Sequence, residues 1–305
     1  MLGSVVCFMA MSVLVKLVRE GGMSTAEVML WRMAPGALVV AAQMRRRAIP
    51  VRPRRPGAVF ARAICGGLAM ALYFWALSRL SLLQFSVIGL SQPVLVALVS
   101  IPLLGERLRL AAVAALGLAL VGAILVVVPD AVFAGRSSDL GAVPLLPALA
   151  AVGYAFLSAV AHAFVRRATR ATNDGAPADA PQTVVLHFSV LVAIAAAVVA
   201  LAQGPLHGPP VSLGRVAGYG ALLGIATFGV VGQLLLSAAY ARANAPETAM
   251  VGYARIPLGF GADVLLWGAM ADVSGLVGAV GVVVAGALLV RGQRPPDSDV
   301  ARETG

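Results

Sequence analysis

Residues 76–106 read ALSRLSLLQFSVIGLSQPVLVALVSIPLLGE, and residues 239–269 read AYARANAPETAMVGYARIPLGFGADVLLWGA. Laid together without gaps, the two stretches share identities that include Ala76/Ala239, Arg79/Arg242, Gly89/Gly252 and Gly105/Gly268, while Pro93 and Pro257 fall one residue out of step. Each stretch joins two apolar runs through a short polar turn. The correspondence predicts an internal repeat with a period of 163 residues.

The composition indicates an integral membrane protein. Of the 305 residues, 60% are hydrophobic and 12% are charged, whereas a soluble domain carries about 25% charged residues. Apolar runs long enough to span a bilayer core recur along the chain. We expect helices, because backbone groups in lipid need internal partners and the runs lack the alternation of barrel strands. The runs are 2–18, 25–43, 60–79, 83–104, 110–128, 141–165, 182–203, 213–238, 246–268 and 273–290.

The repeat period and the number of apolar runs together predict the architecture. A unit of five helices crosses the membrane an odd number of times, so the second copy must be inverted. We expect an all-α integral membrane protein with ten transmembrane helices in two inverted five-helix repeats, residues 1–130 and 131–291. Residues 292–305 are proline-rich and charged, which predicts a disordered cytoplasmic tail.

The net charge of +10 is explained by membrane topology, which removes nucleic acid as the expected partner. With residue 1 placed inside, sixteen arginines fall on inside segments and four on outside segments. This positive-inside bias predicts that both termini are cytoplasmic, in the plasma (inner) membrane if the protein is bacterial. The first run lacks a basic segment and a cleavage site, so it does not read as a secretory signal, although its short length leaves open whether Met1 is the true start.

Motifs for cofactor or metal chemistry are absent from the sequence. Cys7 and Cys65 form neither a disulfide framework nor a metal-binding spacing. No GxxxxGK[ST] loop occurs, and no GxGxxG follows a strand, so we expect no cofactor, no metal and no direct use of ATP. An integral membrane transferase remains an alternative, but it needs a catalytic constellation, and His162 and His187 share no motif. A non-transporting membrane subunit is a further alternative.

Five ionisable residues lie at or near membrane depth: Lys16, Glu27, Arg32, Arg255 and Asp263. Burial of such groups is costly, so each is a functional candidate. Lys16 has the alternative of extending to the outer headgroups, and Glu27 that of an exposed surface position. Arg32 lies about 10 Å into its helix, which favours a cavity-lining role.

A polar face is predicted around Arg255 and Asp263. Thr248, Gly252, Arg255, Gly259 and Asp263 recur at spacings that place them on one helical face. We expect this face to line a transport path, with Arg255 as a fixed positive charge and Asp263 as a distant counter-charge or protonatable gate. The alternative is a pair of structural ion pairs, for example between Arg255 and Glu27.

Uncharged side chains complete the predicted transport path: Tyr73, Gln92, Gln233 and Tyr253 offer hydrogen bonds or ring stacking to a solute. The alternative for the tyrosines is an interfacial aromatic belt. Along the predicted path the cations outnumber the carboxylates, which favours an anionic or zwitterionic solute.

Four segments resemble the EamA family of the drug/metabolite transporter superfamily: FMAMSVLVKL (8–17), EVMLWR (27–32), YFWALSRLSLLQFSVIGLSQPVLVALVSIPLLGERL (73–108) and GQLLLSAAYARANAPETAMVGY (232–253). The resemblance covers residues 2 to 291. Lysine in the first run followed by E-x-x-x-x-R is similar to a branch that includes S-adenosylmethionine carriers.

The resemblance implies ten transmembrane helices in two inverted repeats around a central solute site, and secondary transport of small metabolites, often export. It assigns Gly105 and Glu106 to the family's Gly-Glu motif. The second repeat departs from the family pattern, since Gly268 is followed by alanine, and Arg255 and Asp263 fall where the family is usually apolar or small.

We therefore expect a secondary transporter of a small polar metabolite, anionic or zwitterionic, that works by alternating access and favours export. An S-adenosylmethionine-type or drug carrier of the same fold is the alternative. The sequence does not distinguish coupling to protons from coupling to a counter-solute, and it does not define the oligomeric state.

Overall fold

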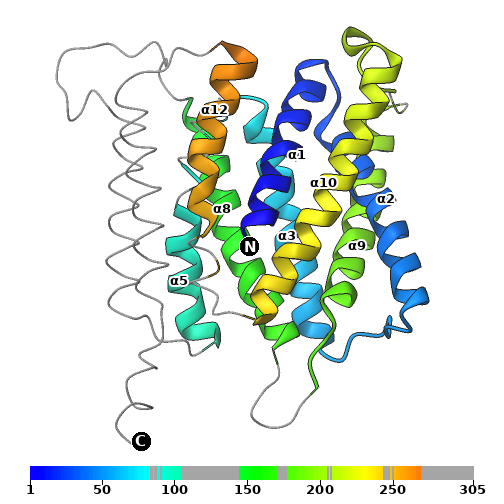
Figure 1. Ribbon diagram of the computed structural model, residues 1–305, viewed down its shortest axis with the longest axis vertical. Coiled ribbons are helices and arrows are strands. Elements are labelled where there is room, and N and C mark those ends of the chain that lie inside the picture. Colours follow the sequence, from blue (N-terminus) through cyan, green and yellow to red (C-terminus); the bar gives the residue numbers. More distant parts are fainter. Residues whose placement is uncertain are drawn as a thin grey trace, which may run out of the picture.

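The computed structural model describes residues 1–80, 82, 85, 88–89, 91–104, 144–170, 177–204, 206, 208–242, 248 and 251–268 (Figure 1). In this part of the chain all regular structure is helical. The helices are α1 (Leu2–Glu20), α2 (Thr25–Arg46), α3 (Pro56–Leu77), α5 (Ser91–Leu104), α8 (Leu145–Thr169), α9 (Pro181–Ala202), α10 (Arg215–Arg242) and α12 (Arg255–Trp267), with 3-10 turns η1 (Val211–Leu213) and η2 (Val251–Ala254).

Five of the described helices are long and apolar enough to cross a membrane: α1, α3, α8, α9 and α10. Large apolar side chains such as Leu38, Ile64, Leu145 and Leu265 point out of the bundle, as expected where lipid rather than water surrounds it. The predicted class of all-helical membrane protein is confirmed. The predicted runs 110–128 and 273–290 lie outside the described residues.

The run 246–268 is not one continuous α-helix. The 3-10 turn η2 precedes α12, and α12 begins at Arg255. Pro257 lies in the first turn of α12, where its missing N–H and fixed φ are tolerated. Gly268 ends the helix with a φ of 63°, a left-handed conformation that favours glycine. The residues of the predicted face are therefore divided between η2, which holds Gly252, and α12, which holds Arg255, Gly259 and Asp263.

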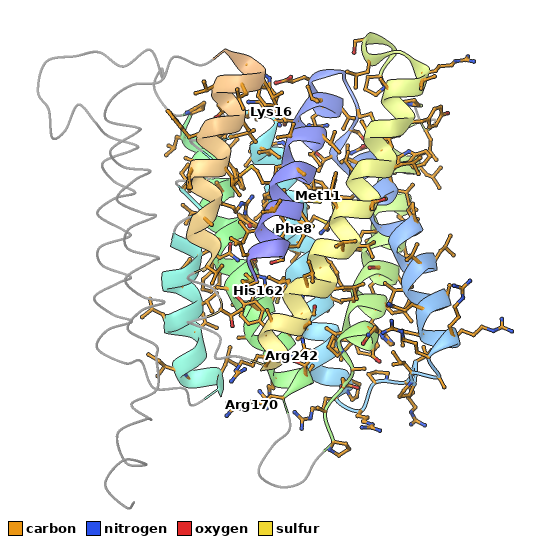
Figure 2. The ribbon with its side chains drawn as sticks, in the orientation of Figure 1. Phe8, Met11, Lys16, His162, Arg170 and Arg242 are labelled. Carbon is orange, nitrogen blue, oxygen red and sulfur yellow. The ribbon has the colours of Figure 1, made fainter. Side chains whose placement is uncertain are left out.

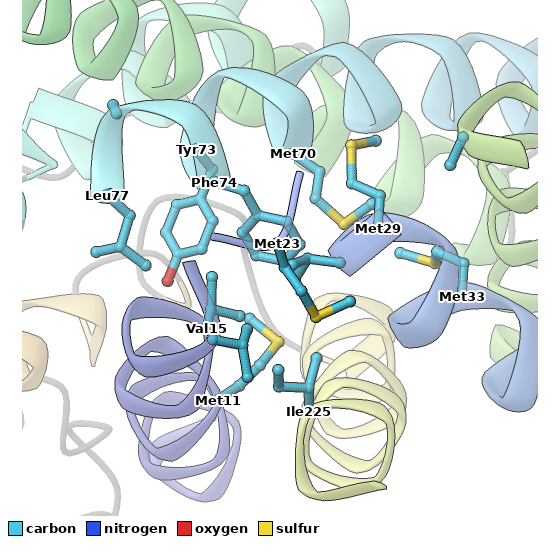
Figure 3. Packing of buried hydrophobic residues seen from close by; sticks show 14 of the residues in the cluster. Met11, Val15, Met23, Met29, Met33, Met70, Tyr73, Phe74, Leu77 and Ile225 are labelled. Carbon is cyan, nitrogen blue, oxygen red and sulfur yellow. The ribbon is translucent and has the colours of Figure 1, made fainter. Parts of the chain in front are cut away.

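The helices pack in pairs that are distant in sequence. The pairs with the most extensive contact are α3 with α8, α2 with α9, and α1 with α10, while α5 lies along α8 and α12 contacts α1 (Figure 1). The core between α1, α2, α3 and α10 is rich in methionine, including Met11, Met29 and Met70 around Phe74 (Figure 3). Unbranched thioether side chains fill irregular gaps between helices.

Loops at one end of the bundle are joined through Asp179, a buried carboxylate. Its Oδ1 accepts the backbone N–H of Arg54 at 2.7 Å, and its Oδ2 accepts that of Arg55 at 3.0 Å. Nearby, the Thr183 hydroxyl donates to the Pro50 carbonyl at 2.9 Å. These bonds fix the connection between α2 and α3 against the start of α9.

We predict that Asp179→Ala lowers the free energy of unfolding by about 1.5–3 kcal/mol, the range for a hydrogen bond to a charged group. The backbone N–H groups of Arg54 and Arg55 would lose their acceptor, the buried carboxylate of Asp179. Thermal denaturation of the purified protein in detergent measures the effect, with the exposed Glu20→Gln as the matched control. Equal melting temperatures for the two variants would contradict the structural role of Asp179.

Candidate functional site

A cavity of about 1010 Å³, including the space at its mouth, lies between α1, α3, α8 and α10. Its walls are largely apolar and aromatic, with Phe8, Phe74 and Phe188 among the lining residues. In Figure 2, Phe8, Met11 and His162 lie at mid-height of the bundle, between Lys16 at one end and Arg170 and Arg242 at the other.

The cavity brings together five of the residues that the sequence predicted for the transport path: Arg32, Tyr73, Gln92, Gln233 and Arg255. Lys16 and Asp263 are not among its lining residues and instead pair with each other. The side chain of Tyr253 lies outside the described part of the structure, as do Gly105 and Glu106.

Arg255 is held at the start of α12 by two tyrosines. Its Nη1 donates to the Tyr154 hydroxyl at 3.2 Å, and its Nη2 donates to the Tyr73 hydroxyl at 3.0 Å. The guanidinium also lies 5.4 Å from the centroid of the Tyr73 ring and 5.8 Å from that of Phe85. The hydroxyl of Tyr73 shares a short hydrogen bond with Ser12. Arg255 is thus oriented from α3, α8 and α1 at once.

The alternative ion pair between Arg255 and Glu27 does not form. Glu27 caps α2, where its carboxylate accepts the backbone N–H of Ser24 at 2.9 Å and its own N–H donates to the Ser24 hydroxyl at 3.2 Å. This reciprocal capping box satisfies two N–H groups at the start of the helix. Glu27 is 3% exposed, so the expectation of an exposed surface position for it is wrong.

Arg32 reaches the cavity from α2 and contacts sulfur atoms. Its Nε lies 3.1 Å from the Met11 Sδ, and its Nη1 contacts the Met70 Sδ. A thioether is a weak acceptor, so neither contact neutralises the guanidinium. Opposite Arg32, Gly229 of α10 leaves the room it needs, since a Cβ there would lie 2.8 Å from the Arg32 Nε.

Arg62 is a cavity residue that the sequence reasoning missed, because it was counted with the cytoplasmic arginines. Since α3 begins at Pro56, four residues before the predicted run, Arg62 lies in its second turn and is 3% exposed. Its guanidinium lies 4.1 Å from the centroid of the Phe188 ring. Its Nε and Nη1 have no hydrogen-bond partner in the described structure. Its position inside an apolar run is the signal that could have identified it.

A neutral hydrogen-bond network faces the arginines across the cavity. The Gln92 Nε2 lies 3.0 Å from the Ser158 hydroxyl and 3.1 Å from the His162 Nδ1, and the Tyr154 hydroxyl donates to the Gln92 Oε1 at 3.3 Å. His162 also stacks on Tyr240. Gln92 is the position that the gapless repeat alignment sets opposite Arg255, and Tyr154 hydrogen-bonds to both side chains.

Lys16 and Asp263 form an ion pair that joins α1 to α12. The Lys16 Nζ lies 3.8 Å from the Asp263 Oδ1 and 4.3 Å from the centroid of the Trp267 ring. The Asp263 Oδ1 also accepts the backbone N–H of Leu82 at 3.3 Å. Both charged side chains are largely buried, at 11% and 6% exposure. Lys16 therefore folds onto α12, and its extension to the headgroups is not observed.

The resulting cavity is strongly cationic. Arg32, Arg62 and Arg255 all line it, and within the described ranges no carboxylate lines it or forms an ion pair with any of the three. Buried charges are normally paired, so this arrangement suits a ligand that brings negative charge. No cluster of three or more metal-ligating side chains occurs among the residues described.

Comparison with known proteins shows what this chain is similar to. Residues 1–128 match the model of the EamA-like transporter family, which confirms the resemblance found in the sequence over that part of the chain. The pseudopaline exporter CntI of Pseudomonas aeruginosa, from strains UCBPP-PA14 and PAO1, is 28% identical to this chain over 276 residues, which cover 90% of this chain and 89% of the exporter. A crystal structure of another protein superposes with a TM-score of 0.69 at 20% identity, covering 97% of this chain and 99% of that one, and thus shares its fold.

Proposed function

We propose that this chain is a secondary exporter of a small anionic or zwitterionic metabolite. Its residues 1–128 match the model of the EamA-like transporter family. The observation that carries the proposal is the cavity lined by Arg32, Arg62 and Arg255, the first two buried and the third partly buried. Within the described residues, none of the three forms an ion pair with a carboxylate. Export is favoured because the similar CntI proteins are exporters. We further propose that it lies in the plasma membrane (the inner membrane if the protein is bacterial), with both termini in the cytoplasm.

The packing of the helices supports two inverted five-helix repeats, residues 1–130 and 131–291, and hence ten transmembrane helices. A two-fold relation between the repeats would exchange α1 with α8, α2 with α9, α3 with α10, and α5 with α12. This exchange turns the contact of α1 with α10 into that of α8 with α3, and the contact of α5 with α8 into that of α12 with α1. The contact of α2 with α9 maps onto itself. Alternating access by rocking of the two repeats follows from such symmetry.

The ion pair between Lys16 and Asp263 is our candidate for the outer gate. It joins α1 to α12, and Lys16 lies at the end of the bundle opposite Arg170 and Arg242 (Figure 2), whose arginine-rich segments are predicted to be cytoplasmic. Protonation of Asp263 would remove its attraction for Lys16 and allow the two helices to separate. Exchange against a counter-solute is the alternative form of coupling.

The proposed function is tested by measuring binding and uptake with wild-type protein and Arg32→Gln. Purified protein is screened by thermal shift against citrate, glutamate, nucleotides and S-adenosylmethionine, because a ligand of the folded state raises the melting temperature. Anions that bind are then tested for uptake into everted vesicles. We expect anions to stabilise the wild type, and Arg32→Gln to weaken their binding by roughly 10-fold or more.

Different outcomes identify the alternatives. Stabilisation by S-adenosylmethionine or by cationic drugs, unchanged in Arg32→Gln, would indicate a carrier of another substrate class on the same fold. Turnover of a lipid substrate by the purified protein would indicate a membrane transferase. Absence of any uptake, together with a stoichiometric protein partner in a pull-down, would indicate a non-transporting subunit.

A further inference from the structure

We propose that the substrate carries at least two separate acidic groups, and that Arg62 binds one of them while Arg255 binds another. The inference rests on the proposed function of anion export and specifies the chemical class of its substrate. It starts from Arg62, whose buried Nε and Nη1 have no hydrogen-bond partner in the described structure, and whose side chain lines the cavity.

One face of α3 lines the cavity, and the three arginines contact this face at successive positions along the helix. Arg62, Gly66, Met70 and Tyr73 follow at helical spacing, and all four line the cavity. From the first to the last of these residues the helix rises about 16 Å. The position along this face at which a charged group makes contact therefore indicates where that group lies along α3.

Each arginine contacts this face at a different level. The Arg62 Nη1 lies against Gly66, where an added Cβ would overlap it, and the Arg32 Nη1 contacts the Met70 Sδ. The third level lies about one further turn along the helix, where the Arg255 Nη2 donates to the Tyr73 hydroxyl at 3.0 Å. Three guanidinium groups thus follow one another along the cavity wall and do not converge on a single point.

This spacing favours a substrate with more than one anionic group. Arg32 and Arg62 both line the cavity, and a carboxylate between them would be attracted to both. The Arg255 Nε is also buried without a hydrogen-bond partner in the part of the chain described. A carboxylate between Arg32 and Arg62 would leave this Nε unsatisfied, because Arg255 contacts the far end of the face. A second acidic group on the same molecule would accept from this Nε. Arginine–carboxylate pairs are strong because two N–H donors act in parallel.

The surfaces beside the charged groups suit a compact, partly apolar connecting segment. The Phe188 ring lies under Arg62 at 4.1 Å, and the Phe8 ring lies 5.9 Å from Arg32. The rings of Tyr73 and Tyr154 contact each other in a tilted arrangement, at a centroid distance of 5.0 Å, beside Arg255. A short carbon chain that bears carboxylates at both ends matches this alternation of cationic and aromatic surface.

The experiment compares glutarate with glutaramate, in which one of the two carboxylates is replaced by an amide of the same shape. Dissociation constants for both are measured by thermal shift titration at constant ionic strength, on the wild type, Arg62→Gln and Arg62→Lys. We expect the wild type to bind glutarate roughly 10-fold or more tightly than glutaramate. Arg62→Gln should remove most of this preference while it retains glutaramate binding, and Arg62→Lys should keep part of the preference.

The melting temperature without ligand separates a binding role from a structural one. If Arg62 is held for the substrate, Arg62→Gln relieves a buried charge that lacks a partner, so the variant should melt at the same or a higher temperature than the wild type. A lower melting temperature together with an unchanged preference for glutarate would overturn the inference. Equal binding of glutarate and glutaramate to the wild type would also overturn it and leave anion transport standing. Failure of every anion to bind would reject the proposed function as well.

Discussion

Replacing Arg255 with glutamine is expected to weaken the binding of citrate or glutarate by roughly 10- to 150-fold, the range for loss of a hydrogen bond to a charged group. Arg255 holds its guanidinium between Tyr73 and Tyr154, so the group needs no rearrangement when a substrate arrives. Glutamine removes the positive charge and shortens the side chain. Titration of the purified variant measures the change in affinity, and proteoliposomes measure the loss of uptake.

Two further variants separate charge from orientation. Arg255→Lys retains the charge but lacks the planar fork of donors, so its affinity should fall between those of wild type and Arg255→Gln. Tyr154→Phe removes the hydroxyl that accepts from Arg255 at 3.2 Å and should reduce affinity less than either, because the Tyr73 hydroxyl remains. If Arg255→Gln is stabilised by the anions as strongly as wild type, Arg255 is structural and the substrate lies elsewhere in the cavity.

The sequence predicted those parts of the molecule that depend on local pattern. Apolar runs predicted the helices that the structure describes, and the rule that buried charge is costly singled out Arg32 and Arg255, which both line the cavity. The same rule failed for Arg62, because a charge near the end of an apolar run is usually assigned to the membrane surface. The start of α3 at Pro56 places Arg62 in the second turn of the helix, where its side chain is buried.

Contacts between distant segments could not be read from the sequence. Spacing placed Asp263 on one face with Arg255, yet Asp263 pairs with Lys16 at the opposite end of the chain. A helical face specifies which residues are neighbours along one helix, whereas pairing depends on which helix packs against that face. The position at which α12 begins could not be predicted for a similar reason, since Pro257 is compatible both with an interrupted helix and with the first turn of a new one.

The two kinds of buried cation in this protein have different consequences for stability. The cavity arginines lack acidic partners in the described structure, a state that destabilises the unliganded protein and is relieved by an anionic ligand. Lys16 has its carboxylate partner already, on α12. Mutations should therefore act in opposite directions: removal of a cavity arginine should spare the stability of the empty protein, whereas removal of one member of the ion pair should reduce it.

Asp263→Asn is expected to lower the free energy of unfolding by about 3–5 kcal/mol, the range for breaking a buried ion pair. The substitution leaves the Lys16 ammonium largely buried at 11% exposure, with the Trp267 ring as its remaining partner within 4.3 Å. Asparagine can still accept the N–H of Leu82, so that hydrogen bond is kept. Denaturant titration in detergent, or thermal denaturation at fixed lipid content, measures the effect.

The double variant Lys16→Met/Asp263→Asn tests whether the two side chains act as a pair. If they do, the double variant should be more stable than Asp263→Asn alone, because it no longer contains a Lys16 ammonium without its carboxylate, and the two single changes should be clearly non-additive. Additive losses would contradict the pairing.

Transport gives a second readout of the role of Asp263. If protonation of Asp263 opens the outer side, the asparagine variant should retain exchange of substrate between the two sides of the membrane. It should lose the stimulation of uptake by a pH gradient. Stimulation that survives in Asp263→Asn would assign proton coupling to another group and leave the ion pair a purely structural role.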